Sequence, residues 1–137
     1  MIKKSVALAF FIISFLLVSN AYGEEDVYYC GEIDGNGFHY DEKNGSYERT
    51  VFSPTKFKMR LHRASNLIEL VEDGTRRKIF TCKNPFPSHP KEMSCFESYY
   101  HFNFNPITGR FVYARIFGYV GGDNDSLSVS YGKCDKF

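Results

Sequence analysis

The chain has 137 residues, with 17 Lys and Arg against 16 Asp and Glu and a formal net charge of +1 at pH 7. This near-neutral balance excludes the strong positive charge typical of nucleic-acid-binding domains, so we expect no nucleic-acid partner. Aromatic residues make up 18% of the chain and tryptophan is absent. Phe and Tyr should therefore supply most of the volume of the core.

Residues 1–23 have the pattern of a secretory signal peptide. Two lysines near the start precede an apolar run over 6–18, and Ala21 and Gly23 are small residues of the kind found before a cleavage site. The run is shorter than the roughly 20 residues that a membrane-spanning helix needs. We therefore predict cleavage before Glu24 and a soluble product, periplasmic or secreted, that does not span a membrane.

Residues 24–137 are predicted to form a single all-β domain. No window of eleven or more residues has apolar positions at helical spacing, whereas alternation of apolar and polar residues recurs along the chain. The expected strands are Val27–Ile33, Gly37–Tyr40, Ser46–Phe52, Lys56–Arg63, Leu67–Glu72, Arg77–Lys83, Met93–Ser98, Tyr100–Asn105, Arg110–Tyr119 and Leu127–Gly132.

Short, turn-like connections join these strands, and the run Asp34-Gly35-Asn36-Gly37 is predicted to be one of the turns. Short connections favour antiparallel neighbours, so the domain is an antiparallel meander. With no helix to cover its apolar face, the sheet must close into a barrel or fold over itself as a small sandwich.

One hairpin pattern occurs twice, at 38–47 and at 102–111. In each copy aromatic and polar residues alternate, an Asp or Asn opens a turn, and a glycine closes it before a further aromatic. The Asp or Asn side chain can bond the turn backbone, and glycine accepts the left-handed conformation that the turn needs. We predict a hairpin at both places, which either a duplicated unit or two independent turns would explain.

Two strands have informative apolar patterns. In Lys56–Arg63 the apolar face carries Phe57, Met59 and Leu61, and the opposite face carries Lys56, Lys58, Arg60 and His62, as in a strand with one packed face and one wet face. By contrast, Arg110–Tyr119 is apolar on both faces, which is typical of a strand covered on both sides.

All four cysteines lie after the signal peptide, and an even number in an exported chain indicates two disulfides. A single Pro-rich connection joins the strands of Cys82 and Cys95, which favours that pair. The remaining pair, Cys30 and Cys134, would tie the first strand to the last. The repeated hairpin favours a rival pairing, Cys30 with Cys82 and Cys95 with Cys134.

No catalytic or metal-binding pattern is recognisable. His39 and His101 occupy equivalent places in the two hairpins, but zinc or copper sites usually need three or four convergent ligands, so exposed strand histidines are the simpler interpretation. We predict no catalytic residues, no metal site and no cofactor, and an enzyme is the less favoured alternative.

A local excess of basic residues lies between positions 56 and 78. If the intervening strand pairs between the two basic segments, they form one sheet surface suited to an anionic envelope component, such as a lipid head group or glycan phosphate, or to the acidic cleft of an exported protein. Neutralisation by nearby acids is the alternative. The residues of this candidate binding face are Lys56, Lys58, Arg60, His62, Arg76, Arg77 and Lys78.

Four short motifs resemble an uncharacterised group of small exported bacterial proteins, mostly proteobacterial. The motifs are aromatic-x-Cys at 28–30, Gly-Phe-x-Tyr-Asp at 37–41, Arg-Phe at 110–111 and Gly-x-Cys at 132–134. The resemblance spans nearly all of the mature chain. It implies a disulfide-containing β fold and carries no activity.

The sequence supports a non-catalytic binding or structural module of the periplasm. The alternative is an inhibitor of an exported hydrolase, since the small C-type lysozyme inhibitors are also disulfide-bearing β-barrels that begin near a Tyr-x-Cys element. Their Ser-Gly-x-[KR]-[YF] loop has no counterpart in this chain. A small hydrolase has only the histidines and acids in its favour.

Overall fold

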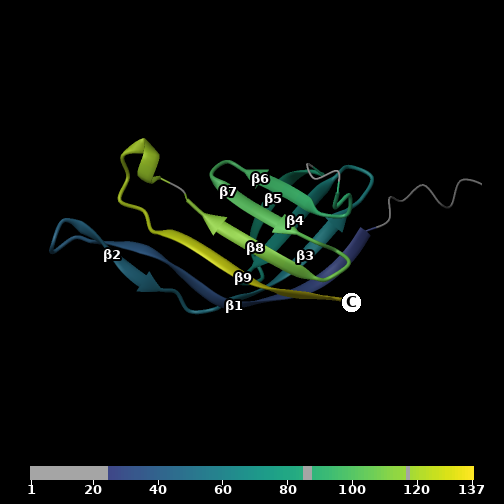
Figure 1. Ribbon diagram of the computed structural model, residues 1–137, viewed down its shortest axis with the longest axis horizontal. Helices are drawn as coiled ribbons and strands as arrows, with labels where there is room; N and C mark the ends of the chain where they lie inside the picture. Colours follow the sequence, from purple (N-terminus) through teal and green to yellow (C-terminus); the bar gives the residue numbers. More distant parts are fainter. Residues whose placement is uncertain (1–24, 85–87, 117) are drawn as a thin grey trace, which may run out of the picture.

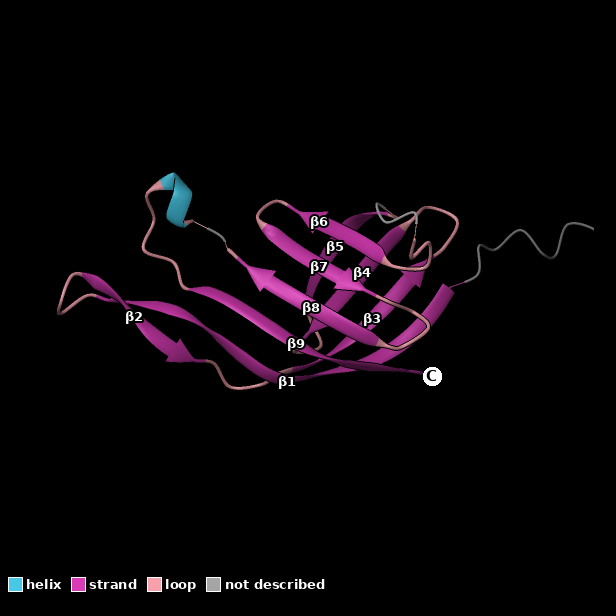
Figure 2. Cartoon of the chain, viewed as in Figure 1, coloured by secondary structure: helices cyan, strands magenta, loops and turns pink. Residues whose placement is uncertain are grey.

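The computed structural model describes residues 25–84, 88–116 and 118–137, so the predicted signal peptide lies outside the described residues. Strands dominate the described chain, with one short 3-10 helix, η1 (Figure 2). No helix of this described part is long and apolar enough to cross a membrane. The elements are β1 (Glu25–Asp41), β2 (Ser46–Val51), β3 (Lys56–His62), β4 (Leu67–Glu72), β5 (Arg76–Lys83), β6 (Met93–Glu97), β7 (Tyr100–Phe104), β8 (Arg110–Arg115), η1 (Tyr119–Gly121) and β9 (Leu127–Lys136).

The sheet closes into an eight-stranded antiparallel barrel with one additional strand. Strands β3 to β9 follow one another in chain order, and β1 pairs with both β3 and β9 to complete the ring. Strand β2 lies outside the ring and pairs only with the far half of β1. Of the two closures that the sequence allowed, the structure shows the barrel.

Strand β1 is much longer than predicted. Its first part, 25–31, pairs with β3, and its last part, 36–41, pairs with β2, while β9 runs beside it from 28 to 38. Residues 36–51, where β1 has passed the end of β3 and pairs with β2, form a hairpin that we call the arm, which projects to the left in Figure 1.

The turn predicted at 34–37 is wrong, because this segment lies inside β1 with a bulge between Glu32 and Asp34. The glycines there serve close packing instead of chain reversal. A Cβ at Gly37 would lie 1.8 Å from the carbonyl oxygen of Leu127. Only glycine lets β1 and β9 approach at this point.

Both predicted hairpins form, and their turns are built alike. The N–H of Gly45 donates to the carbonyl of Asp41, and the N–H of Gly109 donates to that of Asn105, both at 2.8 Å. Each opening side chain also accepts a hydrogen bond from the backbone N–H two residues later. The surroundings differ, because the second hairpin is part of the barrel wall whereas the first forms the arm.

The barrel interior is filled mainly by aromatic side chains, as the composition predicts. Ring centroids of Phe57 and Phe102 each lie 5.3 Å from that of Phe111. The prediction that the strand at 110–119 is covered on both faces is wrong. This strand, β8, ends at Arg115, and its outward-pointing Val112 is 43% exposed. A single-layered barrel has one interior, so the second apolar face of β8 meets solvent.

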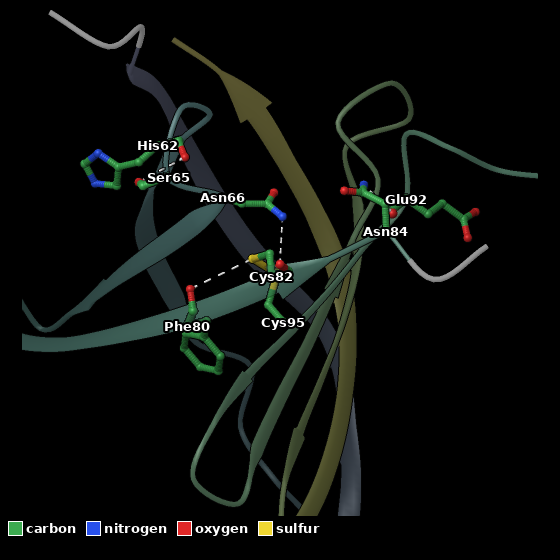
Figure 3. The surroundings of a disulfide bond; sticks show 8 residues. All are labelled: His62, Ser65, Asn66, Phe80, Cys82, Asn84, Glu92 and Cys95. Atoms are coloured by element: carbon green, nitrogen blue, oxygen red, sulfur yellow. Dashed lines mark hydrogen bonds between the residues drawn. A yellow bond between two sulfur atoms is a disulfide. The ribbon is translucent and has the colours of Figure 1, made fainter. Parts of the chain in front are cut away.

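The two disulfides are those favoured by the meander argument, and the rival pairing is excluded. Cys30 and Cys134 join β1 to β9, and Cys82 and Cys95 join β5 to β6, each pair directly opposite in register. Beside the second bond, the amide of Asn66 donates to the carbonyl of Cys82 at 2.7 Å (Figure 3).

Candidate functional site

A cleft of about 600 Å³ lies at the end of the barrel from which the arm departs. Its walls come from the ends of β4 and β8, the starts of β3 and β5, the segment joining β2 to β3 and the segment before β9. We call it the mouth cleft. The charged residues that line it are Glu32, Lys56, Glu72, Asp73, Arg76, Lys78, Arg115 and Asp125.

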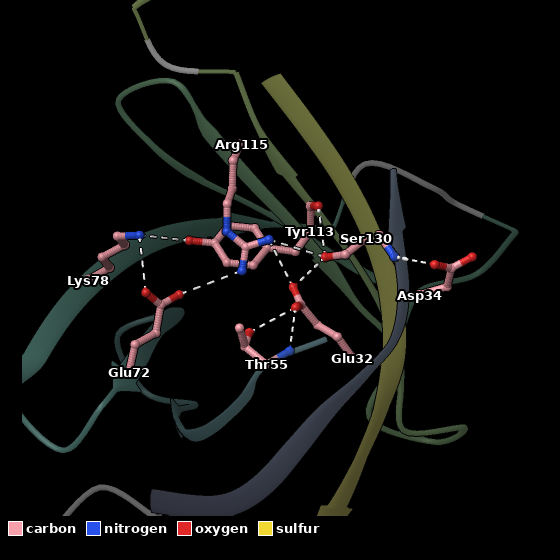
Figure 4. Close-up of polar contacts among 9 residues, drawn as sticks. Glu32, Asp34, Thr55, Glu72, Lys78, Tyr113, Arg115 and Ser130 are labelled. Carbon is pink, nitrogen blue, oxygen red and sulfur yellow. Dashed lines mark hydrogen bonds and ion pairs between the residues drawn. The ribbon is translucent and has the colours of Figure 1, made fainter. Parts of the chain in front are cut away.

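Arg115 is the centre of the polar base of the mouth cleft (Figure 4). Its Nη1 atom lies 2.9 Å from Glu32 Oε1 and 3.3 Å from Ser130 Oγ, and its Nη2 atom lies 3.9 Å from Glu72 Oε1. The guanidinium carbon sits 3.9 Å from the ring centroid of Tyr113, a cation–π contact. One cation therefore holds two carboxylates from different strands.

Glu32 is the most deeply buried acid of the mouth cleft, with a side chain only 4% exposed. Burial by itself would raise the pKa of this carboxyl. Hydrogen bonds from the Ser130 hydroxyl and from the N–H and hydroxyl of Thr55, together with the Arg115 charge, outweigh burial and hold the pKa below its usual value. Glu32 is therefore ionised at neutral pH and cannot donate a proton.

Lys78 completes the base of the cleft. Its Nζ atom lies 3.5 Å from Glu72 Oε2, donates to the Tyr113 hydroxyl at 3.1 Å and sits 4.1 Å from the Tyr100 ring centroid. Burial raises the pKa of Tyr113, so its hydroxyl stays protonated. The other carboxylate oxygen of Glu72, Oε1, is buried without a hydrogen-bond partner among the described residues.

The base and the rim of the mouth cleft differ in how their charged groups are paired. Glu32 lies beside Arg115, and Glu72 lies between Arg115 and Lys78. At the rim, Lys56 and Arg76 are exposed, and no ion pair or hydrogen bond of their side chains occurs within the described chain. The charges at the base of the mouth cleft are therefore paired with one another, whereas the two cations at its rim are not paired within the described chain.

The predicted basic face divides between two places, because successive residues of a strand point to opposite sides. Arg76 and Lys78 share the inner side of β5 with Phe80 and lie at the mouth cleft. The remaining members alternate with the buried residues of β3 or lie on the outer side of β5. These outward residues are Lys56, which also borders the mouth cleft, Lys58, Arg60, His62 and Arg77.

Acids neutralise much of this outer group. Glu69 lies between Arg77, at 2.5 Å, and His62, at 3.6 Å. Arg60 pairs with Glu25 at 3.4 Å. The one continuous basic surface that the sequence indicated therefore does not form, and a binding role of the outward residues stays a prediction.

The two equivalent histidines have separate environments. His39, on the arm, contacts the Ser126 hydroxyl through Nδ1 at 2.8 Å. His101, on β7, packs its ring against Phe96 with centroids 4.7 Å apart. No group of three or more His, Cys, Asp or Glu residues in the described ranges could hold a metal ion.

Sequence reasoning did not single out Arg115, Thr55 or Ser130. One signal was present: Arg115 continues the alternation of Phe111 and Tyr113, so it occupies an inward position at the end of an apolar strand. A charge at such a position indicates a paired group inside the structure. Nothing comparable marks Thr55, which belongs to a short linker.

The fold and the cleft define the class: a closed, disulfide-bonded antiparallel β-barrel with a polar cleft at its mouth. Comparisons of the chain with protein-family models, with curated proteins and with solved structures find no match.

Proposed function

We propose that the protein is a non-catalytic binding module of the periplasm or another exported compartment, which holds a small ligand in the mouth cleft. The single observation that carries the proposal is the contrast between the base and the rim of the cleft. The base charges are fixed by Arg115, whereas Lys56 and Arg76 at the rim have no partner within the described residues. Preorganised polar groups in a concave site are typical of ligand-binding clefts.

The size of the cleft and the redox state of the chain support the same proposal. A volume of about 600 Å³ falls within the usual range for small-molecule sites. The two disulfides fit an oxidising compartment, in agreement with the signal-peptide pattern of residues 1–23.

Filling the cleft tests this function. Ser53 lines the mouth cleft, is exposed and makes no described side-chain hydrogen bond, so Ser53→Trp should obstruct the cleft without breaking the fold. Ser46→Trp on the arm, outside the lining, is the matched control. Native mass spectrometry of protein recovered from a periplasmic extract should show a bound small molecule on the wild type and on the control only. A wild type without adduct, or an adduct retained by Ser53→Trp, contradicts the proposal.

The arm favours a second candidate, an inhibitor of an exported hydrolase. Tyr47 donates its hydroxyl to the carbonyl of Asp125 at 3.0 Å, and its ring lies 5.3 Å from the rings of both Tyr40 and Tyr119. These contacts brace a projecting hairpin, and a rigid hairpin loses little conformational entropy on entering the cleft of another protein.

A pull-down from a periplasmic extract separates the two candidates. If the arm inhibits a hydrolase, the pull-down should capture an enzyme that the wild-type protein inhibits. Replacing the exposed tip residues Glu42 and Lys43 by Ala should abolish this inhibition, whereas Ser53→Trp should inhibit like the wild type. If the variant with both tip residues replaced still inhibits the enzyme, the arm is not the inhibitory element.

A further inference from the structure

Opposite charges lie side by side at the inner side of β4 and β5, at the edge of the mouth cleft. Arg76 is directly opposite Glu72 in the register of these strands, so both side chains leave the same face of the sheet. Glu72 nevertheless contacts Lys78 and Arg115, and Arg76 makes no described ion pair. Glu72 and Arg76 are therefore neighbours without a described ion pair between them, so one ligand could contact both.

Each member of this pair has an unused binding capacity. Glu72 Oε1 is buried, and its contact with Arg115 at 3.9 Å is too long for a hydrogen bond. A carboxylate oxygen without a hydrogen-bond donor costs free energy, and because the Glu72 side chain is 19% exposed, a ligand N–H that reaches the carboxylate can recover it. Arg76 presents the planar donor fork that matches a carboxylate, and Lys56 adds a second positive charge at the same cleft.

The charges along the cleft decide which ligand chemistry fits. Its lining holds four acids and four bases, Glu32, Glu72, Asp73 and Asp125 against Lys56, Arg76, Lys78 and Arg115. A simple anion would suit the rim cations but would face these carboxylates. A neutral glycan could donate to Glu72 but would leave Arg76 without an anion.

We propose that the mouth cleft binds a zwitterionic ligand of the amino-acid or short-peptide class, with its ammonium group at the Glu72 carboxylate and its carboxylate on Arg76 and Lys56. This inference rests on the proposed binding function and assigns the ligand class. A dipolar ligand satisfies both unused groups at once and adds no net charge to a lining whose own charges cancel.

Titration calorimetry with four probes tests the charge requirement. Alanine and dialanine carry both groups at two separations, whereas N-acetyl-dialanine lacks the ammonium group and dialanine amide lacks the carboxylate. At least one zwitterion should bind, and each blocked form should bind about tenfold more weakly than the tighter-binding zwitterion or not at all. Failure of both zwitterions, or equal binding of either blocked form, overturns the proposal.

A variant with a matched control locates the carboxylate end. Arg76→Gln should weaken binding of the zwitterion about tenfold and leave the melting temperature unchanged, because Arg76 has no partner within the described chain to lose. Arg110→Gln, an exposed arginine at the start of β8 and outside the mouth cleft, should bind like the wild type. Unchanged affinity in Arg76→Gln contradicts the assignment.

The two proposals fail in different ways. If Ser53→Trp abolishes the adduct recovered from the extract but no zwitterionic probe binds, the binding function holds and the ligand class is wrong. If the wild type recovers no adduct and alanine and dialanine both fail, the cleft is not a ligand site and both proposals fall.

Discussion

Arg115 is the residue on which the mouth of the barrel most depends. Arg115→Leu would leave Glu32 buried without its cation, and breaking a buried ion pair on one side is strongly destabilising. We expect a loss of about 3 kcal/mol in the free energy of unfolding, at the low end of the usual range because the Arg115 side chain is 25% exposed. Urea unfolding measures this loss.

Arg110→Leu is the control for that substitution, since Arg110 lies on the same strand, is exposed and has no described side-chain partner. Its effect should stay within about 0.5 kcal/mol. Equal losses in the two variants would show that the Arg115 pair contributes nothing beyond an ordinary surface arginine.

Carboxylates with lowered pKa values predict how stability responds to acid. A hydrogen bond from Lys136 lowers the pKa of Asp26; burial opposes this effect and Arg63 adds to it. A hydrogen bond from Arg77 lowers the pKa of Glu69. A folded-state pKa below the unfolded value gives stability that is complete above the unfolded pKa and is lost as the pH falls through the folded one.

The free energy of unfolding should therefore be nearly constant around neutral pH and fall below about pH 4.5. Asp26→Asn should lower stability at pH 7 and flatten this acid decline, because it removes one of the linked groups. Asp135→Asn, at an exposed position of β9, should leave the profile unchanged. Urea unfolding between pH 3 and 7 checks both, and an unaltered slope in Asp26→Asn would contradict the linkage.

At the scale of the element, β1 depends on its glycines for a steric reason. Gly37→Ala would push a methyl group into the backbone of Leu127, so the arm or β9 must shift, at a cost of about 2 kcal/mol. A Cβ at Gly31 meets nothing within 4 Å, so Gly31→Ala should be neutral or slightly stabilising. Urea unfolding of the two variants makes the comparison, and equal effects would show that the close approach is not rigid.

Local patterns predicted most elements because the physics behind them is local. Alternation located β3 to β7 to within about one residue, and the opening Asp41 and Asn105 identified both hairpin turns. The prediction failed where the cause is distant in the sequence. The sequence around Gly37 is typical of a turn, yet glycine is needed there because the backbone of Leu127 lies so close.

The mouth cleft could not be predicted for the same reason. Glu32, Thr55, Glu72, Arg115 and Ser130 are scattered along the chain, and barrel closure alone brings them together. Closure into a barrel was one of two predicted outcomes, but the register that sets Arg115 beside Glu32 follows from pairings between distant strands. The local excess of basic residues between 56 and 78 predicted a binding surface on the outer face of the sheet, and acids partly neutralise that face.

For the molecule as a whole, the two disulfides should contribute unequally. Cys30 and Cys134 are 104 residues apart, whereas Cys82 and Cys95 are separated by 13. Loop-closure entropy in the unfolded chain makes the longer link worth about 1.8 kcal/mol more. Urea unfolding of Cys30→Ala/Cys134→Ala and of Cys82→Ala/Cys95→Ala should show the larger loss in the first variant. The reverse order would mean that strain or residual structure governs the difference.

The long disulfide also has a consequence for the order in which the cysteines of the growing chain become oxidised. Cys30, Cys82 and Cys95 all precede Cys134, so Cys30 must wait for its partner while two other thiols are already present. An oxidant that joined cysteines in order of emergence would couple Cys30 with Cys82 and Cys95 with Cys134. The native barrel therefore requires either that Cys30 stay unpaired until the last strand has emerged or that thiol–disulfide exchange correct an early wrong pair.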